Sequence, residues 1–133
     1  MDEVSRLIEG IPLFPFKGSM LTKYFDKLLE LGVILLAKGD NENIGMAGFY
    51  ANDMATFQAY LSFVSVRDDF RGKGVGTELL NKVCEISRSK CMTTIGLNVV
   101  STNSSAIRFY EGLGFNVVGR GRDEAHFFMS KKL

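Results

Sequence analysis

The spacing of apolar side chains along this chain changes near residue 33. Before that point, apolar residues recur every three or four positions within 2–9 and again within 19–31, which predicts two amphipathic helices. Pro12 and Pro15 keep the stretch between these helices out of regular helix. Gly32 follows the last apolar position of the second helix, so we expect it to end that helix in the left-handed conformation.

From residue 33 onward, short runs rich in β-branched and aromatic residues alternate with turn residues, which is typical of strands. Three such runs predict an antiparallel meander, and they cover 33–38, 44–51 and 56–66. Helices to about residue 89 and over 103–111 are expected to alternate with further strands at 94–100, 115–118 and 125–131. A strand, a helix and a strand in succession favour a crossover with parallel pairing. The sequence therefore predicts an α/β fold, with a mixed sheet that has an antiparallel front and a central parallel pair and is flanked by helices.

Length and composition indicate one compact unit without a global charge. The chain has 133 residues and no internal repeat or linker, so we expect a single domain over 1–133. Its longest apolar run, 31–37, is far too short to cross a bilayer. The net charge is +1, so no global field attracts nucleic acid or an acidic membrane, and we expect neither as a partner. An anionic ligand must therefore be held by a local arrangement.

The two cysteines do not indicate a metal site. Cys84 and Cys91 lack the spacing of metal ligands, and the single histidine, His126, lies far from both in sequence. We therefore expect reduced, structural thiols in a cytoplasmic protein that binds no metal.

The segment 71–76 joins a predicted strand to a predicted helix and has glycine at every second position. Glycine allows backbone N–H groups to approach a ligand closely, and the helix that follows presents unpaired N–H groups at the same place. Arg71 and Lys73 add two positive charges. These features suit a pyrophosphate, although the spacing matches neither the P-loop nor the dinucleotide fingerprint. A flexible turn with solvated charges is the alternative interpretation.

Two segments resemble motifs of the GNAT superfamily of N-acetyltransferases. Residues 64–76, VSVRDDFRGKGVG, resemble motif A with its Arg/Gln-x-x-Gly-x-Gly/Ala core, and residues 103–115, NSSAIRFYEGLGF, resemble motif B. The likeness extends from about residue 44 to the C-terminus. It implies one acetyltransferase domain that moves an acetyl group from acetyl-CoA onto a primary amine by direct attack.

The same resemblance implies where acetyl-CoA, the co-substrate, binds. It would lie in a cleft between the strands at 56–66 and 94–100, and a β-bulge near 62–65 would open that cleft by splaying two parallel neighbours. The pantetheine arm would pair with strand backbone, and the pyrophosphate would bind the glycine loop. The cofactor-binding residues expected on this basis are Val64, Ser65, Val66, Arg71, Gly72, Lys73, Gly74, Val75, Gly76 and Asn103.

The resemblance also implies catalytic roles. The oxyanion donor would be a backbone N–H near Ser65 or Val66, and Tyr110 would protonate the departing thiolate. An ordinary phenol has a pKa of about 10 and can donate at neutral pH. Tyr110 can also be read as a core aromatic, and Asn103 as a helix cap.

The general base and the acceptor are left open by the sequence. An alkyl amine with a pKa of about 10.4 is neutral only at roughly one part in two thousand at pH 7, so its deprotonation matters. Several relatives carry a glutamate on the strand at 56–66 or on the next one. Here the first of these strands has Gln58, Tyr60 and Ser62, and the next has Asn98 at the corresponding position, so none is a carboxylate. Water, or one of the side chains Asp53, Glu124 and His126, could serve instead. We expect the N-terminal segment, with Phe14 and Phe16, to line the acceptor site, unless these aromatics are core residues.

Two other interpretations stay open, and the missing carboxylate supports the first of them. A non-catalytic acyl-CoA-binding module or sensor would keep the cleft without chemistry, and a transferase of longer acyl groups would keep the chemistry. The acceptor could be a small molecule or a peptide, and a homodimer through terminal strands is expected from the resemblance. A nucleotide-phosphate enzyme is disfavoured because no metal-binding Ser or Thr follows a Gly-Lys pair.

Overall fold

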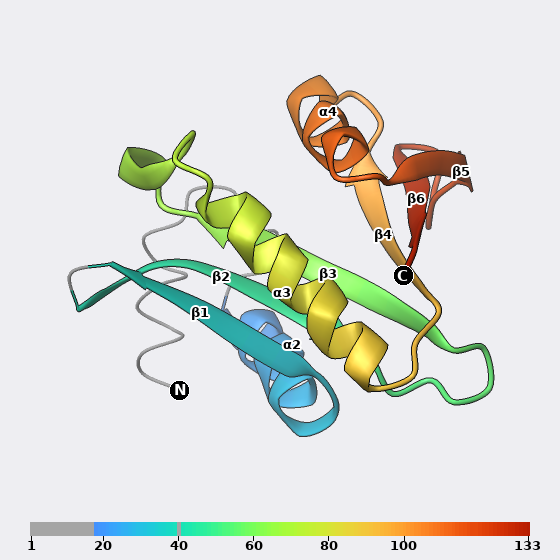
Figure 1. Cartoon of the computed structure of the whole chain (residues 1–133), viewed down its shortest axis with the longest axis horizontal. Coiled ribbons are helices and arrows are strands. Elements are labelled where there is room, and N and C mark those ends of the chain that lie inside the picture. The colour runs from blue at the N-terminus through green and yellow to red at the C-terminus, as the bar shows by residue number, and fades with distance from the viewer. Residues whose placement is uncertain (1–17, 40) are drawn as a thin grey trace.

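The protein is built around a six-stranded mixed sheet (Figure 1). The computed structural model describes residues 18–39 and 41–133. The strand order is β1-β2-β3-β4-β6-β5, in which β3 and β4 are parallel and every other neighbouring pair is antiparallel. The bounds are β1 (Val33–Gly39), β2 (Glu42–Tyr50), β3 (Gln58–Val66), β4 (Thr94–Val100), β5 (Asn116–Arg120) and β6 (His126–Lys132). The predicted fold class, with an antiparallel front and a central parallel pair, is confirmed.

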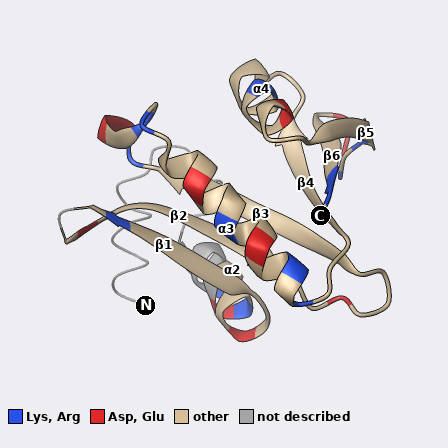
Figure 2. Cartoon of the chain, in the orientation of Figure 1, with Lys and Arg blue, Asp and Glu red and all other residues tan. Residues whose placement is uncertain are grey.

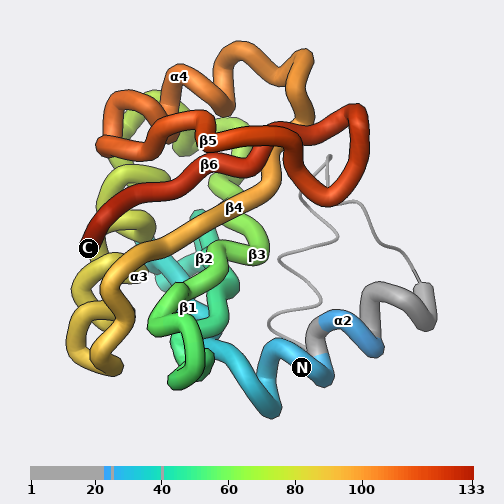
Figure 3. The backbone as a smooth tube through the Cα atoms, turned by 90° about the vertical axis from the view of Figure 1, so that its right-hand side faces the viewer, coloured from blue at the N-terminus to red at the C-terminus, as the bar shows by residue number. Residues whose placement is uncertain are grey.

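Helices cover both faces of this sheet. The helix α3 (Val75–Ser89) connects β3 to β4 and packs across β1, β2 and β3. The helix α2 (Gly18–Leu31) packs on the opposite face, as Figure 3 shows. A 3₁₀ turn, η1 (Asp68–Phe70), precedes α3, and α4 (Ser104–Gly112) follows β4. In the described ranges 18–39 and 41–133, no helix is long and apolar enough to span a membrane.

The strand β2 shows how the sheet separates two apolar layers. Ala47 and Phe49 are fully buried in the larger core, which α3 covers. Met46 points to the other face, where it packs with Leu28 of α2. Because successive side chains of a strand point to opposite faces, a strand covered on both sides is apolar at almost every position.

The parallel pair at the centre is short and then opens. The strands β3 and β4 are paired only from Gln58 to Tyr60 and from Thr94 to Gly96. Directly after this pairing, the register between β2 and β3 shifts, because Gly48 lies opposite Phe63 and Phe49 lies opposite Leu61. Ser62 is the extra residue of this bulge. The bulge expected near residues 62–65 is therefore confirmed, and beyond it the β4-facing edge of β3 is unpaired with β4.

Two local details differ from the expectations. Gly32 does not have a positive φ. It is needed for space, because a Cβ there would lie 2.7 Å from the Phe49 carbonyl oxygen. The strand β3 begins at Gln58 rather than at 56, because Asp53 Oδ1 accepts hydrogen bonds from the N–H groups of Ala55 and Thr56 in a turn. The predictions for Phe14, Phe16 and the first helix lie outside the described residues.

Candidate active site

A cleft of about 780 Å³ occupies the place where β3 and β4 separate. It is bordered by the second half of β3, the loop before α3, the first turn of α3, the end of β4 and one side of α4 with its cap residue. Both segments with the GNAT-like motifs therefore meet at one site. The lining residues are Ser62, Phe63, Val64, Ser65, Val66, Phe70, Arg71, Gly72, Gly74, Val75, Gly76, Thr77, Asn98, Val99, Val100, Asn103, Ser105, Ala106, Phe109 and Tyr110.

The glycine loop provides a backbone cradle at one end of this cleft. Gly72 and Gly74 have φ values of 76° and 86°, a region that other residues enter only with strain. No atom lies within 4 Å of a Cβ built at either position, so the backbone conformation, rather than space, requires glycine there. Gly74 caps α3 without a side-chain hydrogen bond. The first N–H groups of α3 have no acceptor within the helix and lie at the cleft, where they suit an anion.

Basic residues lie in the loop before α3, as the blue segments of the ribbon there show (Figure 2). Arg71 lines the cleft, and its Nε lies 3.1 Å from Asp68 Oδ1 and 3.4 Å from the Val66 carbonyl oxygen. Lys73 does not line the cleft. Its Nζ lies over the Phe70 ring, 5.1 Å from the centroid. Both side chains are exposed, so either can reorient toward a bound anion at small cost.

Asn103 and Tyr110 bring the second motif to the same cleft. Asn103 Oδ1 accepts a hydrogen bond from the N–H of Ala106 at 3.1 Å, so this side chain caps α4 while also lining the cleft. The Tyr110 ring packs edge-on against Phe109 and Phe115. Burial raises the pKa of Tyr110 to about 12, above the ordinary value expected from the sequence. The phenol is thus protonated at neutral pH and is a proton donor rather than a base.

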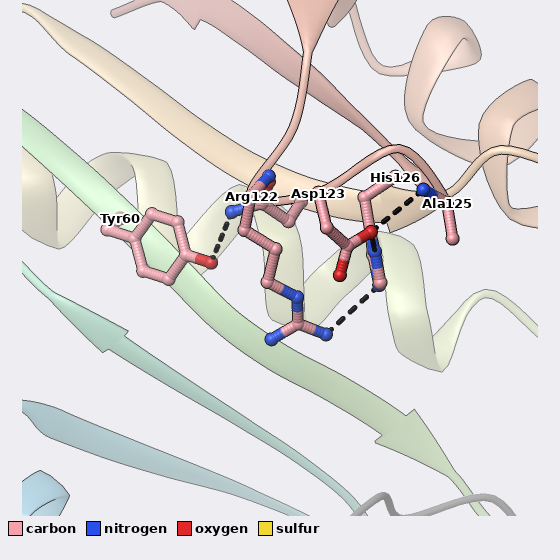
Figure 4. Close-up of polar contacts among 6 residues, drawn as sticks. Tyr60, Arg122, Asp123, Ala125 and His126 are labelled. Atoms are coloured by element: carbon pink, nitrogen blue, oxygen red, sulfur yellow. Dashed lines mark hydrogen bonds and ion pairs between the residues drawn. The ribbon is translucent and has the colours of Figure 1, made fainter.

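Asn98 connects the cleft to a polar cluster that the motifs do not contain. Figure 4 shows this cluster with Tyr60, Arg122 and His126 labelled. Asn98 Nδ2 donates to the Tyr60 hydroxyl oxygen at 2.8 Å, and its Oδ1 accepts from the N–H of Arg122 at 2.9 Å. Arg122 belongs to the loop between β5 and β6, and sequence reasoning missed it. A signal existed in the dense run of charged residues at 120–124, but a charged hairpin loop is most often only solvated.

The three side chains considered as general bases lie in different parts of the structure. Asp53 lies in the turn before β3, at the paired end of β3 and β4 and away from the cleft, and hydrogen bonds from Thr56 and Ala55 lower its pKa. Glu124 is almost fully exposed and pairs with Arg120. Only His126 stands in the cluster around Asn98, through Arg122. Among the described residues, the cleft lining contains no carboxylate, and no group of three His, Cys, Asp or Glu side chains could hold a metal.

Both cysteines are free thiols within the described chain, and neither lines the cleft. Cys84 is buried on α3, where burial raises the pKa of its thiol. It is therefore not an activated nucleophile.

The whole arrangement corresponds to a known family. Residues 1–115 match the sequence profile of the Acetyltransferase (GNAT) family. The chain belongs to the GNAT family. A GNAT relative, the L-methionine sulfoximine/L-methionine sulfone acetyltransferase of Pseudomonas paraeruginosa, is 30% identical over 103 residues, which are 73% of this chain and 59% of the relative. The [ribosomal protein bS18]-alanine N-acetyltransferase of Salmonella typhimurium is 34% identical over 71 residues, which are 53% of this chain and 48% of that protein.

Among solved GNAT structures, the PaiA N-acetyltransferase of Thermoplasma acidophilum in complex with coenzyme A superposes with a TM-score of 0.70 at 25% identity. The match covers 86% of this chain and 69% of that one. This chain spans about half to three fifths of the length of the two curated relatives.

Proposed function

We propose that this GNAT protein is an N-acetyltransferase that transfers the acetyl group of acetyl-CoA to a primary amine. The observation that carries the proposal is the cleft itself, which joins a glycine cradle, an unpaired strand edge and a protonated tyrosine in one space of about 780 Å³. These features fit a long CoA thioester, because each of them suits one part of that molecule.

The cradle and the strand edge supply binding. The free N–H groups at the start of α3, with Arg71 beside them, suit the pyrophosphate. Lys73 can join them by turning away from Phe70. Beyond the bulge at Ser62, the backbone of Val64, Ser65 and Val66 is unpaired with β4, so an extended pantetheine arm can pair with it like an additional strand. A backbone N–H of Ser65 or Val66 is the proposed oxyanion donor.

Tyr110 supplies the proton for the leaving group. In the reaction, the amine nitrogen bonds to the thioester carbon, the carbon–sulfur bond breaks, and the Tyr110 phenol donates its proton to the sulfur. A phenol with a pKa of about 12 is a stronger base after donation than an ordinary tyrosinate, so it regains a proton quickly. The amine nitrogen loses one proton as the amide forms, which equals the one proton that Tyr110 gives to the sulfur and later takes up again.

Binding and turnover test the proposal separately. Calorimetric titration should show tight binding of acetyl-CoA and no binding of ATP, and CoA release should then be measured with a panel of primary amines. Release that depends on both substrates supports the transferase. If the titration showed no binding of acetyl-CoA, the proposal would be wrong.

The absence of a carboxylate from the described lining favours a second candidate, an acyl-CoA sensor of the same fold. A sensor binds acetyl-CoA but releases no CoA with any amine. Preference for longer thioesters in the same assay would identify a different acyl group.

The acceptor class is only partly indicated by the relatives. One relative is named for an amino-acid derivative and another for the alanine of a ribosomal protein, so small-molecule and peptide amines both fit. A single domain over 1–133, a homodimer and a cytoplasmic location stay predictions.

A further inference from the structure

The loop between β5 and β6 lies where an acceptor would approach the cleft. On β3 and β4, Leu61 and Leu97 point into the core that α3 covers, so Tyr60 and Asn98 point to the other face of the sheet. This is the face on which α2 packs, and the β5–β6 loop projects toward the same side in Figure 3. Asn98 belongs both to the cleft lining and to this face. The loop therefore stands beside the end of the cleft that is away from the glycine cradle.

The loop is held against Asn98 by close contacts. The N–H of Arg122 donates to Asn98 Oδ1 at 2.9 Å, and the N–H of Gly121 donates to the His126 carbonyl oxygen at 2.8 Å. A Cβ at Gly121 would lie 2.5 Å from Asn98 Oδ1 and 2.8 Å from the His126 Cβ. This part of the loop is therefore fixed at its backbone, unlike a loop that is only solvated.

The side chain of Arg122 is positioned by a histidine rather than by a carboxylate. His126 Nδ1 lies 2.7 Å from Asp123 Oδ1, and its Nε2 lies 3.0 Å from an Nη atom of Arg122 (Figure 4). A guanidinium can only donate, so Nε2 is the acceptor and Nδ1 carries the proton that is given to Asp123. The His126 side chain is only 13% exposed, which keeps the imidazole in place.

The Arg122 guanidinium has N–H groups that remain available for a ligand. Asp123 is occupied by His126 and by the N–H of Ala125, and no ion pair with a carboxylate lies within 4.0 Å of Arg122 in the described part of the chain. On the side toward α2, its charge reaches the Tyr24 hydroxyl, whose pKa burial raises to about 12 while Arg122 opposes that rise. Hydrogen bonds from His126 and Ala125 lower the pKa of Asp123 and the charge of Arg122 adds to this effect, so the guanidinium lies near one carboxylate without forming an ion pair with it.

We propose that Arg122 binds a carboxylate of the acceptor, so that the preferred acceptors are amines with a carboxylate a few bonds from the nitrogen, as in free amino acids. The inference rests on the proposed transferase function. A guanidinium fork and a carboxylate match in a bidentate geometry, and the remaining donors of Arg122 allow it. We expect a short spacer, because the backbone N–H of Arg122 is bonded to Asn98, a residue of the cleft lining, and the guanidinium can lie no further from this point than one arginine side chain. Asn98, His126 and Asp123 are positioning residues in this arrangement.

The test compares matched acceptors in the acetyl-CoA-dependent CoA release assay. Each free amino acid is paired with its primary amide, which keeps the amine and removes the negative charge. The wild type should favour the acid, and Arg122→Ala should raise the KM for the acid on the order of 10- to 100-fold and remove the preference over the amide. The Kd of acetyl-CoA should stay unchanged, which shows that the variant is folded. Arg122→Lys should restore part of the preference, since it keeps the charge but not the fork.

Arg120→Ala is the matched control, because Arg120 belongs to the same hairpin, is exposed and, among the residues that the structure describes, forms its ion pair with Glu124. It should leave both acceptor KM values unchanged. Equal use of acid and amide by the wild type, or an unchanged ratio in Arg122→Ala, would overturn the carboxylate site while leaving the transferase intact. Binding of acetyl-CoA without CoA release from any amine would overturn the transferase, and the inference with it.

Discussion

The amide of Asn98 donates a hydrogen bond to the hydroxyl oxygen of Tyr60 at 2.8 Å, across the two central strands. Tyr60 is the last residue of β3 that pairs with β4, and its partner in the register is Gly96. Asn98 is therefore one of the first residues beyond the parallel pairing. The hydrogen bond links the two strands at the point where they begin to separate, and Asn98, an amide, is a structural link there rather than a base.

The variant Tyr110→Phe tests the proposed acid. Removing the phenol should lower kcat by about two to four orders of magnitude, which is the usual contribution of a positioned acid. The Kd of acetyl-CoA should change little, because the ring that packs against Phe109 and Phe115 is kept. Steady-state kinetics and calorimetry measure the two quantities. An unchanged kcat across pH would remove Tyr110 from the mechanism.

The raised pKa of Tyr110 predicts how the rate depends on pH. Because the phenol keeps its proton until pH approaches about 12, it should cause no loss of rate between pH 7 and 10. The rate should instead rise as the acceptor amine loses its proton, with a midpoint at the amine's own pKa, which is about 10.4 for an alkyl amine and lower for an α-amine. The tyrosinate absorbance should show a late-titrating group that is missing in Tyr110→Phe. The assignment would be contradicted if the titration that disappears in Tyr110→Phe had its midpoint near pH 10 in the wild type.

The raised pKa of Tyr110 also makes the free energy of unfolding depend on pH. The pKa of Tyr110 is higher in the folded chain than the ordinary value near 10 of the unfolded chain, so the neutral form is favoured by folding. Its contribution to the free energy of unfolding is complete below pH 10 and is lost as the pH rises toward 12. In Tyr110→Phe, the midpoint of alkaline unfolding should therefore lie at higher pH than in the wild type.

Charge reversal at both basic positions of the loop tests the pyrophosphate site. Arg71→Glu combined with Lys73→Glu should weaken acetyl-CoA binding by at least an order of magnitude, because each change replaces an attraction by a repulsion at the mouth of the cradle. The control is Lys82→Glu, which makes the same change on the exposed side of α3, where Lys82 pairs with Glu85. Equal Kd values for the three proteins would contradict the site.

Backbone conformation at the cradle can be tested with a pair of glycines. Gly74→Ala should cost about 1–2 kcal/mol, because φ is 86°, and should weaken acetyl-CoA binding as the first N–H groups of α3 turn away. Gly112→Ala is the control, since Gly112 ends α4 without a positive φ and a Cβ there meets no atom within 4 Å. Thermal unfolding and calorimetry measure both effects. The cradle would be unsupported if Gly74→Ala bound acetyl-CoA as tightly as Gly112→Ala.

The sequence predicted those features that depend on neighbouring residues. Alternating glycines before a helix indicated special backbone angles, and the structure has a positive φ at Gly72 and at Gly74, which caps α3. The bulge at Ser62 was expected only from the family resemblance, because bulges have no periodic signal of their own. The placement of Lys73 over Phe70 depends on side-chain rotamers, which the pattern does not specify.

The contacts around Arg122 could not be predicted for a different reason. Asn98 and Arg122 are 24 positions apart, and their hydrogen bond exists only because β6 pairs with β4 and carries the loop along. Short charged loops are usually read as solvated surface, and nothing local distinguishes Arg122 from Arg120. A tertiary contact of this kind is set by strand order, which the sequence pattern gives only coarsely.

The last prediction concerns the two glycines of the β5–β6 hairpin. Gly121→Ala should lower the free energy of unfolding by about 1–3 kcal/mol, because its Cβ would overlap with Asn98 Oδ1 and the His126 Cβ. Gly119→Ala should be tolerated, since a Cβ there meets no atom within 4 Å. Displacement of the loop should also raise the KM for the acceptor in Gly121→Ala, while the Kd of acetyl-CoA stays near the wild-type value. Chemical denaturation and acceptor kinetics on both variants separate the loss of stability from the loss of acceptor binding. If Gly121→Ala weakened acetyl-CoA binding as strongly as acceptor binding, the loop would not be specific to the acceptor side.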